Sequence, residues 1–291
     1  MMLSTAALSR RYGDHVALDG VDLAVPDGAV YGLVGPNGAG KTTLLAILAG
    51  LRRPSSGTIS CGCPRRRVAL LPDTPQFDPW LTGREVVALA WQLVAAPVPA
   101  SRIDAVLRDM GLTDAADRRV GGYSRGMLQR LGLAATVVGD PELLLLDEPA
   151  SALDPGGRRE VLDLIARLPA TTLLSSHILA DVQEVCDTVG ILRAGRLLYQ
   201  GPLDALLVGR AVPAYQVRLR EPVDPVAERL RAEPWVTTVE RDNGHSLRVG
   251  VRSLAEAELL LPRALAACDA RVISLAPRAA DLEDVFLELT S

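Results

Sequence analysis

The chain has 291 residues, of which 48% are hydrophobic and 23% charged, and its formal net charge at pH 7 is −4. This length predicts about two domains, and this composition is that of a globular protein with ample apolar residues for a core. The acidic balance excludes strong electrostatic attraction to nucleic acid or anionic lipid, and no apolar run reaches the ~20 residues that a membrane-spanning helix needs.

A glycine-rich loop with one lysine is the strongest motif of the chain. It follows residues 29–34, an apolar run that predicts a strand buried on both faces, and precedes residues 41–51, which are predicted to form a helix closed near Gly50. The loop Gly35–Thr43 reads Gly-Pro-Asn-Gly-Ala-Gly-Lys-Thr-Thr, and Lys41 is the only lysine of the chain. This spacing is typical of a nucleotide-phosphate site, because glycines let backbone N–H groups face an anion and the lysine reaches the β and γ phosphates.

The loop also assigns individual ligands. The residues predicted to bind the nucleotide are Asn37, Gly38, Ala39, Gly40, Lys41, Thr42 and Thr43. The Thr42 hydroxyl is predicted to be a ligand of Mg²⁺ as well, and the N-terminus of the following helix adds its positive dipole end. The loop alone indicates a nucleotide and leaves the reaction open.

Two of the four cysteines form the segment Cys61-Gly62-Cys63. The segment lacks a second ligand pair at zinc-like spacing, so a turn between strands is favoured over a metal site. A chain with this large a core has no need of disulfides, and we expect reduced thiols. The adjacent Arg65-Arg66-Arg67 favours a solvated turn over a binding patch.

Residues 77–140 are predicted to form a helical insertion. Thr82-Gly83-Arg84-Glu85 opens its first helix, and the apolar surface around it admits two interpretations. One is internal core. The other is a groove in which Phe77, Trp80 and Leu81 receive a short helix from a membrane partner.

A second helix start follows a glycine stretch within the insertion. Ser124 is predicted to be the N-cap of an apolar-periodic helix, so this start is a second anion site. Because it and the lysine loop are helix N-termini of different subdomains, we expect a second copy of the chain to bring the two together.

Two further buried strands end in polar residues. Residues 143–146 are four leucines followed by Asp147 and Glu148, and residues 171–175 are followed by Ser176 and His177. Because the carboxyl ends of parallel strands share one edge of a sheet, these side chains and the lysine loop predict one active site. Asp147 is expected to hold Mg²⁺, Glu148 to orient or deprotonate the attacking water, and His177 to contact the γ phosphate. The alternatives are an acidic pair that caps the next turn and a histidine satisfied in the core.

The order of these motifs resembles the ATP-binding subunit of an ABC transporter. The resemblance covers the chain to about residue 205 and rests on the lysine loop, Tyr123–Arg130, Leu143–Pro149, Ser151–Pro155 and His177. The family's Leu-Ser-Gly-Gly-Gln signature stands here as Tyr-Ser-Arg-Gly-Met. This variant, and the chain end Leu282–Thr290, are similar to the ABC-2 type exporter subfamily that includes daunorubicin-resistance and sodium-export ATPases.

The resemblance implies an α/β fold, namely a P-loop NTPase cassette with a RecA-like core, an antiparallel β subdomain and a helical subdomain. It implies an ATPase that uses ATP and Mg²⁺, with Lys41, Glu148 and His177 as its catalytic residues. By the same resemblance, Tyr12 stacks on adenine.

The resemblance also implies partners. Ser124 and Gly126 bind the γ phosphate held by a partner copy, and Asp154 lies at the dimer interface. The implied assembly is a head-to-tail homodimer that sandwiches ATP and docks on an integral membrane permease, at the cytoplasmic face of the cell membrane.

One position departs from the family pattern. The loop that touches Mg²⁺ and the attacking water has Gln or Glu after Leu-Pro in the family, whereas Leu71-Pro72 is followed here by Asp73. Aspartate is a good Mg²⁺ ligand but is shorter than Glu and adds negative charge. Gln76 is the alternative residue for this role.

The pattern changes after residue 209, which predicts domains at residues 1–209 and 210–291. Strands are expected at residues 215–220, 237–241, 246–251 and 271–275, and helices at 225–231, 254–267 and 281–289. Residues 242–245 between the second and third strands give a hairpin signal. The order βαββαβ predicts a small ferredoxin-like α+β domain, for which an interaction or dimer-stabilising role is expected.

Two other functions compete with export. A soluble ABC ATPase acting on nucleic acid or the ribosome usually has paired cassettes or basic arms, whereas this chain has one cassette and net acidity, so we expect no nucleic-acid partner. A P-loop GTPase or small-molecule kinase is the other. A guanine-reading Asn-Lys-x-Asp motif is excluded, because Lys41 is the only lysine.

Overall fold

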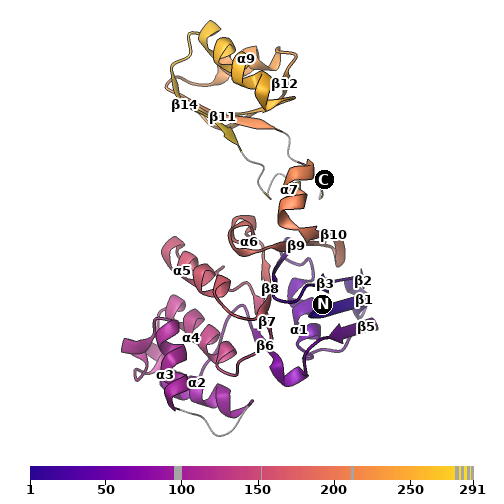
Figure 1. Ribbon diagram of the computed structural model, residues 1–291, viewed down its shortest axis with the longest axis vertical. Helices are drawn as coiled ribbons and strands as arrows, with labels where there is room; N and C mark the ends of the chain where they lie inside the picture. Colours follow the sequence, from indigo (N-terminus) through magenta and orange to yellow (C-terminus); the bar gives the residue numbers. More distant parts are fainter. Residues whose placement is uncertain are drawn as a thin grey trace. The chain divides into compact units, whose positions relative to one another are not determined.

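The computed structural model describes residues 1–94, 100–151, 153–210 and 213–278, and the single residues Leu282, Val285, Phe286 and Leu289. The chain divides into two units, Met1–Leu203 and Asp204–Ser291 (Figure 1). Contacts thus divide it at the start of helix α7 (Leu203–Arg210), whereas the sequence pattern placed the boundary near the end of that helix.

The first unit contains a six-stranded sheet of order β10-β9-β4-β8-β7-β6. Its strands are β4 (Val30–Val34), β6 (Val68–Leu71), β7 (Leu143–Asp147), β8 (Thr171–Ser176), β9 (Thr188–Arg193) and β10 (Arg196–Pro202). All neighbours are parallel except β9 and β10. The three strands predicted from continuous apolar runs, β4, β8 and β7, are direct neighbours. Their carboxyl ends therefore meet at one edge.

A separate antiparallel sheet precedes and flanks it. Strand β1 (Leu3–Tyr12) pairs with β2 (His15–Val21), with β3 (Ala24–Val25) and with β5 (Ser56–Cys61). The segment Cys61–Cys63 lies where β5 ends, as the turn interpretation predicted. Among the described residues no group of three His, Cys, Asp or Glu side chains is arranged to hold a metal ion.

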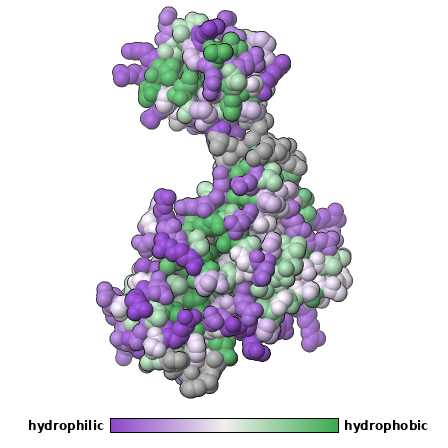
Figure 2. Space-filling view, in the orientation of Figure 1, coloured by the Kyte–Doolittle hydropathy of each residue, from purple (hydrophilic) through white to green (hydrophobic). Residues whose placement is uncertain are grey.

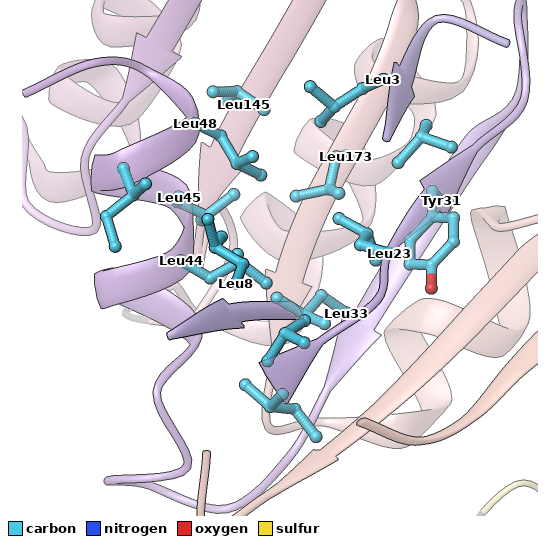
Figure 3. Packing of buried hydrophobic residues seen from close by; sticks show 14 of the residues in the cluster. Leu3, Leu8, Leu23, Tyr31, Leu33, Leu44, Leu45, Leu48, Leu145 and Leu173 are labelled. Carbon is cyan, nitrogen blue, oxygen red and sulfur yellow. The ribbon is translucent and has the colours of Figure 1, made fainter. Parts of the chain in front are cut away.

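Helix α1 (Lys41–Leu48) packs between the two sheets of the first unit. Its residues Leu44, Leu45 and Leu48 point toward strand residues such as Leu145 and Leu173 (Figure 3). The helix ends before the predicted residue 51, because Gly50 takes the left-handed φ of 73° and the Leu51 N–H bonds back to the Ala46 carbonyl. The leucine core thus fixes the helix that starts at the lysine.

The predicted helical insertion is present as a group of helices at one end of the first unit (Figure 1). It contains α2 (Gly83–Gln92), α3 (Ala100–Asp109) and α4 (Arg125–Val137), with single 3₁₀ turns at Thr113–Ala115 and Val120–Gly122. The Thr82 hydroxyl accepts from the Glu85 N–H while the Glu85 carboxylate accepts from the Thr82 N–H, a reciprocal cap that starts α2 where the sequence predicted. Trp80 is 72% exposed, so it is not internal core.

Three further helices belong to the first unit. They are the 3₁₀ helix η1 (Arg65–Arg67), α5 (Pro155–Ala166) and α6 (Leu179–Val185). The η1 arginines are exposed or half-buried, and Arg67 pairs with Asp140 and Glu142. This agrees with a solvated turn.

The second unit has the predicted order of elements and a core of its own. Its elements are β11 (Ala214–Leu219), α8 (Asp224–Arg231), β12 (Val236–Asn243), β13 (Ser246–Val251), α9 (Leu254–Ala267) and β14 (Val272–Arg278). The strands form an antiparallel sheet of order β12-β13-β11-β14. Asn243 pairs with Ser246, so the predicted hairpin is present with Gly244 and His245 as its turn. Most of the predicted closing helix over 281–289 lies outside the described residues.

The surface mixes hydrophilic and hydrophobic side chains on both units in the face shown by Figure 2. Within the part of the chain that the structure describes, no helix has the length and apolar character that spanning a bilayer requires.

Candidate nucleotide-binding site

The glycine loop joins β4 to α1 and borders a hollow of about 300 Å³. The hollow is lined by His15, Ala17, Pro36, Asn37, Gly38, Ala39, Gly40, Lys41, Thr42, Thr43, Asp73 and Glu148. Gly40 has a φ of 108°, and a Cβ at this position would lie 2.5 Å from the Ala17 carbonyl oxygen. Only glycine fits here, so the loop can lie close to Ala17 of the antiparallel sheet while its backbone lines the hollow, where N–H groups can bind an anion.

Lys41 is buried at the start of α1 and already has three oxygen partners. Its ammonium donates to the Gly35 carbonyl at 2.7 Å and to the Pro36 carbonyl at 3.4 Å, and it lies 3.2 Å from Glu148 Oε1. Such a charge is tolerated inside a protein only when it is paired. Phosphate oxygens entering the hollow are suitable replacements for the carboxylate partner.

Glu148 connects the lysine to the histidine. Its Oε2 accepts from His177, at 2.8 Å from Nδ1 and 3.4 Å from the backbone N–H. Its backbone has a φ of 47°, a left-handed conformation that costs a non-glycine residue about 1–3 kcal/mol, and its N–H is held by the Ser175 hydroxyl and carbonyl. With this left-handed backbone, the Glu148 carboxylate faces Lys41.

The alternative interpretations of these residues do not fit the geometry. His177 is 41% exposed, so it is not a core histidine. The Glu148 carbonyl accepts from the Ser151 N–H and thus takes part in the next turn, but its carboxylate faces Lys41 and His177. The side chain of Glu148 therefore does not cap the turn that follows it.

Asp147 lies one residue deeper than Glu148, at the end of β7. It is 4% exposed, and its Oδ1 accepts from the Ser175 hydroxyl at 2.6 Å. It does not line the hollow, whereas Thr42 and Asp73 do. Carboxylate and hydroxyl oxygens are the ligands that Mg²⁺ takes, usually completed by water and substrate phosphates, so the donor set fits this ion.

The structure distinguishes the two candidates in the loop after β6. Asp73 lines the hollow and accepts from the Ser151 hydroxyl at 3.2 Å. Gln76 is exposed and is not among the lining residues. The departure from the family pattern thus adds a second carboxylate, besides that of Glu148, to the lining of the hollow.

Tyr12, predicted to stack on adenine, lies at the end of β1 and does not line the hollow. The Arg10 guanidinium lies 4.4 Å from its ring centre, and Arg52 donates to its hydroxyl at 2.9 Å. Burial raises the pKa of the Tyr12 hydroxyl, but hydrogen bonds from Arg10 and Arg52 outweigh it and leave this pKa lowered. His15, which was not predicted from the sequence, lines the hollow instead. The only sequence signal for this role is its position three residues after Tyr12, the predicted adenine contact.

The signature residues form a second hollow of about 490 Å³. It is lined by Ser124, Arg125, Gly126, Arg130, Leu153, Asp154, Gly156, Gly157 and Glu160. Ser124 is the N-cap of α4 and accepts from the Met127 N–H at 3.3 Å, as predicted. The structure thus brings Ser124, Gly126 and Asp154 together, in a hollow that shares no described residue with the one beside Lys41.

Comparison with known proteins agrees with this arrangement. A model of the ABC transporter family matches residues 18–151. The daunorubicin resistance ATP-binding protein DrrA3 of Streptomyces coeruleorubidus is 36% identical, over 97% of this chain and 93% of its own length. The Nod factor export ATP-binding protein I of Burkholderia orbicola (strain AU 1054) is 34% identical, over 97% of this chain and 95% of its own length.

A solved structure described as the ATP binding subunit of an ABC transporter is 30% identical, with a TM-score of 0.65, and covers 72% of this chain and 93% of its own. Relatives thus match nearly the whole length of the chain, which includes the glycine loop, the strained Glu148 and the helix that starts after Ser124. The chain belongs to the ATP-binding subunits of ABC transporters, a family of ATPases.

Proposed function

We propose that the chain hydrolyses ATP with Mg²⁺ as a head-to-tail homodimer and thereby powers export through an integral membrane permease. The observation that carries the proposal is the contact series Lys41, Glu148 and His177 beside the glycine loop. It pairs a cation for phosphates with a carboxylate placed to accept a proton from water.

The roles of the side chains follow from their present partners. On ATP binding, the Lys41 ammonium exchanges its contact with Glu148 for contacts with the β and γ phosphate oxygens. The Glu148 carboxylate is then free to orient water and take its proton. His177 contacts Glu148 Oε2 through Nδ1 and would contact the γ phosphate of bound ATP. Thr42, Asp147 and Asp73 would hold Mg²⁺, which when bound neutralises charge on the phosphate oxygens.

The dimer is proposed because each chain carries two separate half-sites. Ser124, Gly126 and Asp154 share the second hollow with Arg125 and Arg130, which adds positive charge to a helix N-terminus. A partner that turned this hollow toward the first would close both sites. Tyr12 would stack on an adenine that extends beyond the first hollow, past His15.

The permease is proposed from the relatives and the surface. The relative named for Nod factor export and the relative named for daunorubicin resistance match nearly all of the chain. Trp80 is 72% exposed beside the half-buried Phe77 and Leu81, which suits a short helix from a membrane partner. The chain would work at the cytoplasmic face of the membrane. The net charge of −4 gives less support to an ABC ATPase that acts on nucleic acid or the ribosome.

We further propose that the second unit is a ferredoxin-like domain that stabilises the dimer. The ferredoxin-like fold is supported by the element order βαββαβ with the antiparallel sheet order β12-β13-β11-β14.

The test compares Lys41→Ala with Glu148→Gln. Loss of the buried ammonium should weaken ATP binding at least tenfold, since phosphate charge then has no counter-charge in the hollow. Glu148→Gln keeps the shape but removes the base, so ATP should bind while turnover falls by at least about a hundredfold. Gel filtration with MgATP should then show a dimer for Glu148→Gln.

Glu142→Gln is the matched control, because Glu142 directly precedes β7 at its opposite end and pairs with Arg67 outside the hollow. It should bind and hydrolyse ATP as the parent does. A Glu148→Gln protein that stays monomeric with saturating MgATP would contradict the sandwich dimer, and one that keeps parental turnover would contradict the role of Glu148.

A further inference from the structure

The end of β5 carries two thiols in contact that the proposed reaction does not use. The Sγ atoms of Cys61 and Cys63 are 3.5 Å apart, and one thiol donates a hydrogen bond to the other. Cys61 is the last residue of β5, and Gly62 and Cys63 form the bend that follows it, so the chain turns between the two thiols and their side chains meet. All four cysteines of the chain are free thiols in this structure.

The backbone holds this pair in place. Gly62 donates its N–H to the Met2 carbonyl at 2.7 Å, which ties the turn to the segment entering β1. A Cβ on Gly62 would lie 3.3 Å from the Met1 carbonyl oxygen and 3.4 Å from that of Met2. The glycine therefore permits the two backbones to pack closely, and this contact fixes the backbone that carries both thiols.

The two thiols differ in access. Cys61 is exposed, whereas Cys63 is 7% exposed and belongs to the core cluster that also contains Leu3 and Leu48. Burial, together with the hydrogen bond to Cys61, raises the pKa of the Cys63 thiol to about 12. A dissolved reagent can therefore reach Cys61, while Cys63 stays protonated and screened from it. This is the asymmetry of an attacking thiol and a resolving thiol.

We propose that Cys61 and Cys63 form a reversible dithiol–disulfide site that exchanges with small disulfides of the glutathione disulfide class. The two sulfur atoms of a disulfide lie about 2.05 Å apart. Rotation of the two side chains has to bring the Sγ atoms from 3.5 Å to this distance. Because the bond would close a very short loop at an exposed strand end, it should be easily reduced again.

The exchange balances in two steps. The Cys61 thiolate attacks one sulfur of the small disulfide, whose S–S bond breaks; one half leaves as a thiolate and takes up the proton that Cys61 released. The Cys63 thiol then loses its proton as its sulfur attacks the Cys61 sulfur, and the second half leaves as a thiol. The protein dithiol has then lost two electrons and two protons, and the small disulfide has gained them.

The experiment incubates the full chain with glutathione disulfide, blocks remaining thiols under denaturing conditions and maps the tryptic peptides by mass. Both cysteines fall in one peptide, which ends at Arg65, so an internal disulfide appears as the loss of two hydrogens. Blocked thiols should fall from four to two, with Cys186 and Cys268 unchanged. Dithiothreitol should restore all four.

Two variants separate the roles. In Cys63→Ala no resolving thiol remains, so Cys61 should stay as a mixed disulfide with glutathione. In Cys61→Ser the buried Cys63 should stay a thiol. Cys268→Ser is the matched control and should form the disulfide as the parent does.

A parent that stays fully reduced, or that stops at the mixed disulfide on Cys61, would overturn the proposal. The measurement on the parent does not depend on how well the Cys63 variant folds.

Discussion

At the scale of single residues, the site depends on one buried cation shared between two kinds of oxygen. Lys41 is 6% exposed and Glu148 12% exposed, so removing either leaves the other with a charge that water cannot reach easily. The strained φ of Glu148 makes sense in this light, because it brings the carboxylate to the ammonium. In the proposed reaction, binding of phosphate by Lys41 and release of Glu148 would be a single event.

Asp73 tests how charge in this hollow affects Mg²⁺. Asp73→Asn removes one negative charge at nearly constant volume, so the Mg²⁺ concentration for half-maximal hydrolysis should rise about two- to fivefold. Binding of metal-free ATP should be equal or tighter, since one repulsion with the phosphates is lost. A Mg²⁺ titration of steady-state turnover and a binding titration in EDTA give the two quantities.

Asp73→Gln separates reach from charge, because it restores the amide that the family has at this position. Gln76→Ala is the control, since Gln76 is exposed and outside the hollow, and it should titrate as the parent does. If both Asp73 variants also titrate as the parent does, Asp73 is not part of the metal site.

At the scale of elements, the sequence predicted most of what positions the site. Continuous apolar runs identify β4, β7 and β8, and polar residues directly after them place the chemistry at one edge. Two features were beyond the sequence. The arginines around Tyr12 come from β1 and from Arg52, forty positions along the chain, and only folding brings them together. The position of His15 depends on the pairing of β1 with β2, which no motif announces.

Helix α4, which starts at the second hollow, packs against the loop after β6, which lines the first hollow. Gly132 lies at this contact. A Cβ at Gly132 would lie 2.7 Å from Leu71 Cδ1 and 2.8 Å from Pro75 Cγ. Leu71 is 1% exposed and the proline ring is rigid, so neither can yield easily. Any residue larger than glycine must push the helix away from the loop that carries Asp73.

Gly132→Ala should therefore destabilise the first unit. Overpacking costs about 1–3 kcal/mol, which outweighs the ~1 kcal/mol that alanine gains in a helix. The midpoint of urea unfolding followed by circular dichroism should fall, and ATP turnover should fall with it because Asp73 moves. Gly122→Ala is the control, since its Cβ would have only Arg118 at 4.0 Å, and it should keep the parental midpoint. A parental midpoint for Gly132→Ala would contradict the close packing.

At the scale of the whole molecule, the hollow beside Lys41 and the hollow beside Ser124 are separate. In the proposed dimer they would be the phosphate-binding half and the signature half of a site. Lesions in the two halves should therefore behave as different complementation groups. Lesions in the same half should not. This distinction rests on the proposed dimer and does not require the permease.

Mixing Ser124→Arg with Lys41→Ala should restore ATP turnover, although each protein is inactive alone. A hybrid dimer has one site that carries both lesions and one that carries neither, so a random mixture in equal amounts should reach about a quarter of parental turnover if the intact sites act independently. Turnover is measured against the mixing ratio, and circular dichroism checks that Ser124→Arg, which loses the N-cap of α4, remains folded. Lys41→Ala mixed with Glu148→Gln is the control, because both lesions lie in the phosphate-binding half and leave no intact site in any dimer. Turnover that stays at the level of the separate proteins at every ratio would show that Ser124 does not act on the partner's ATP.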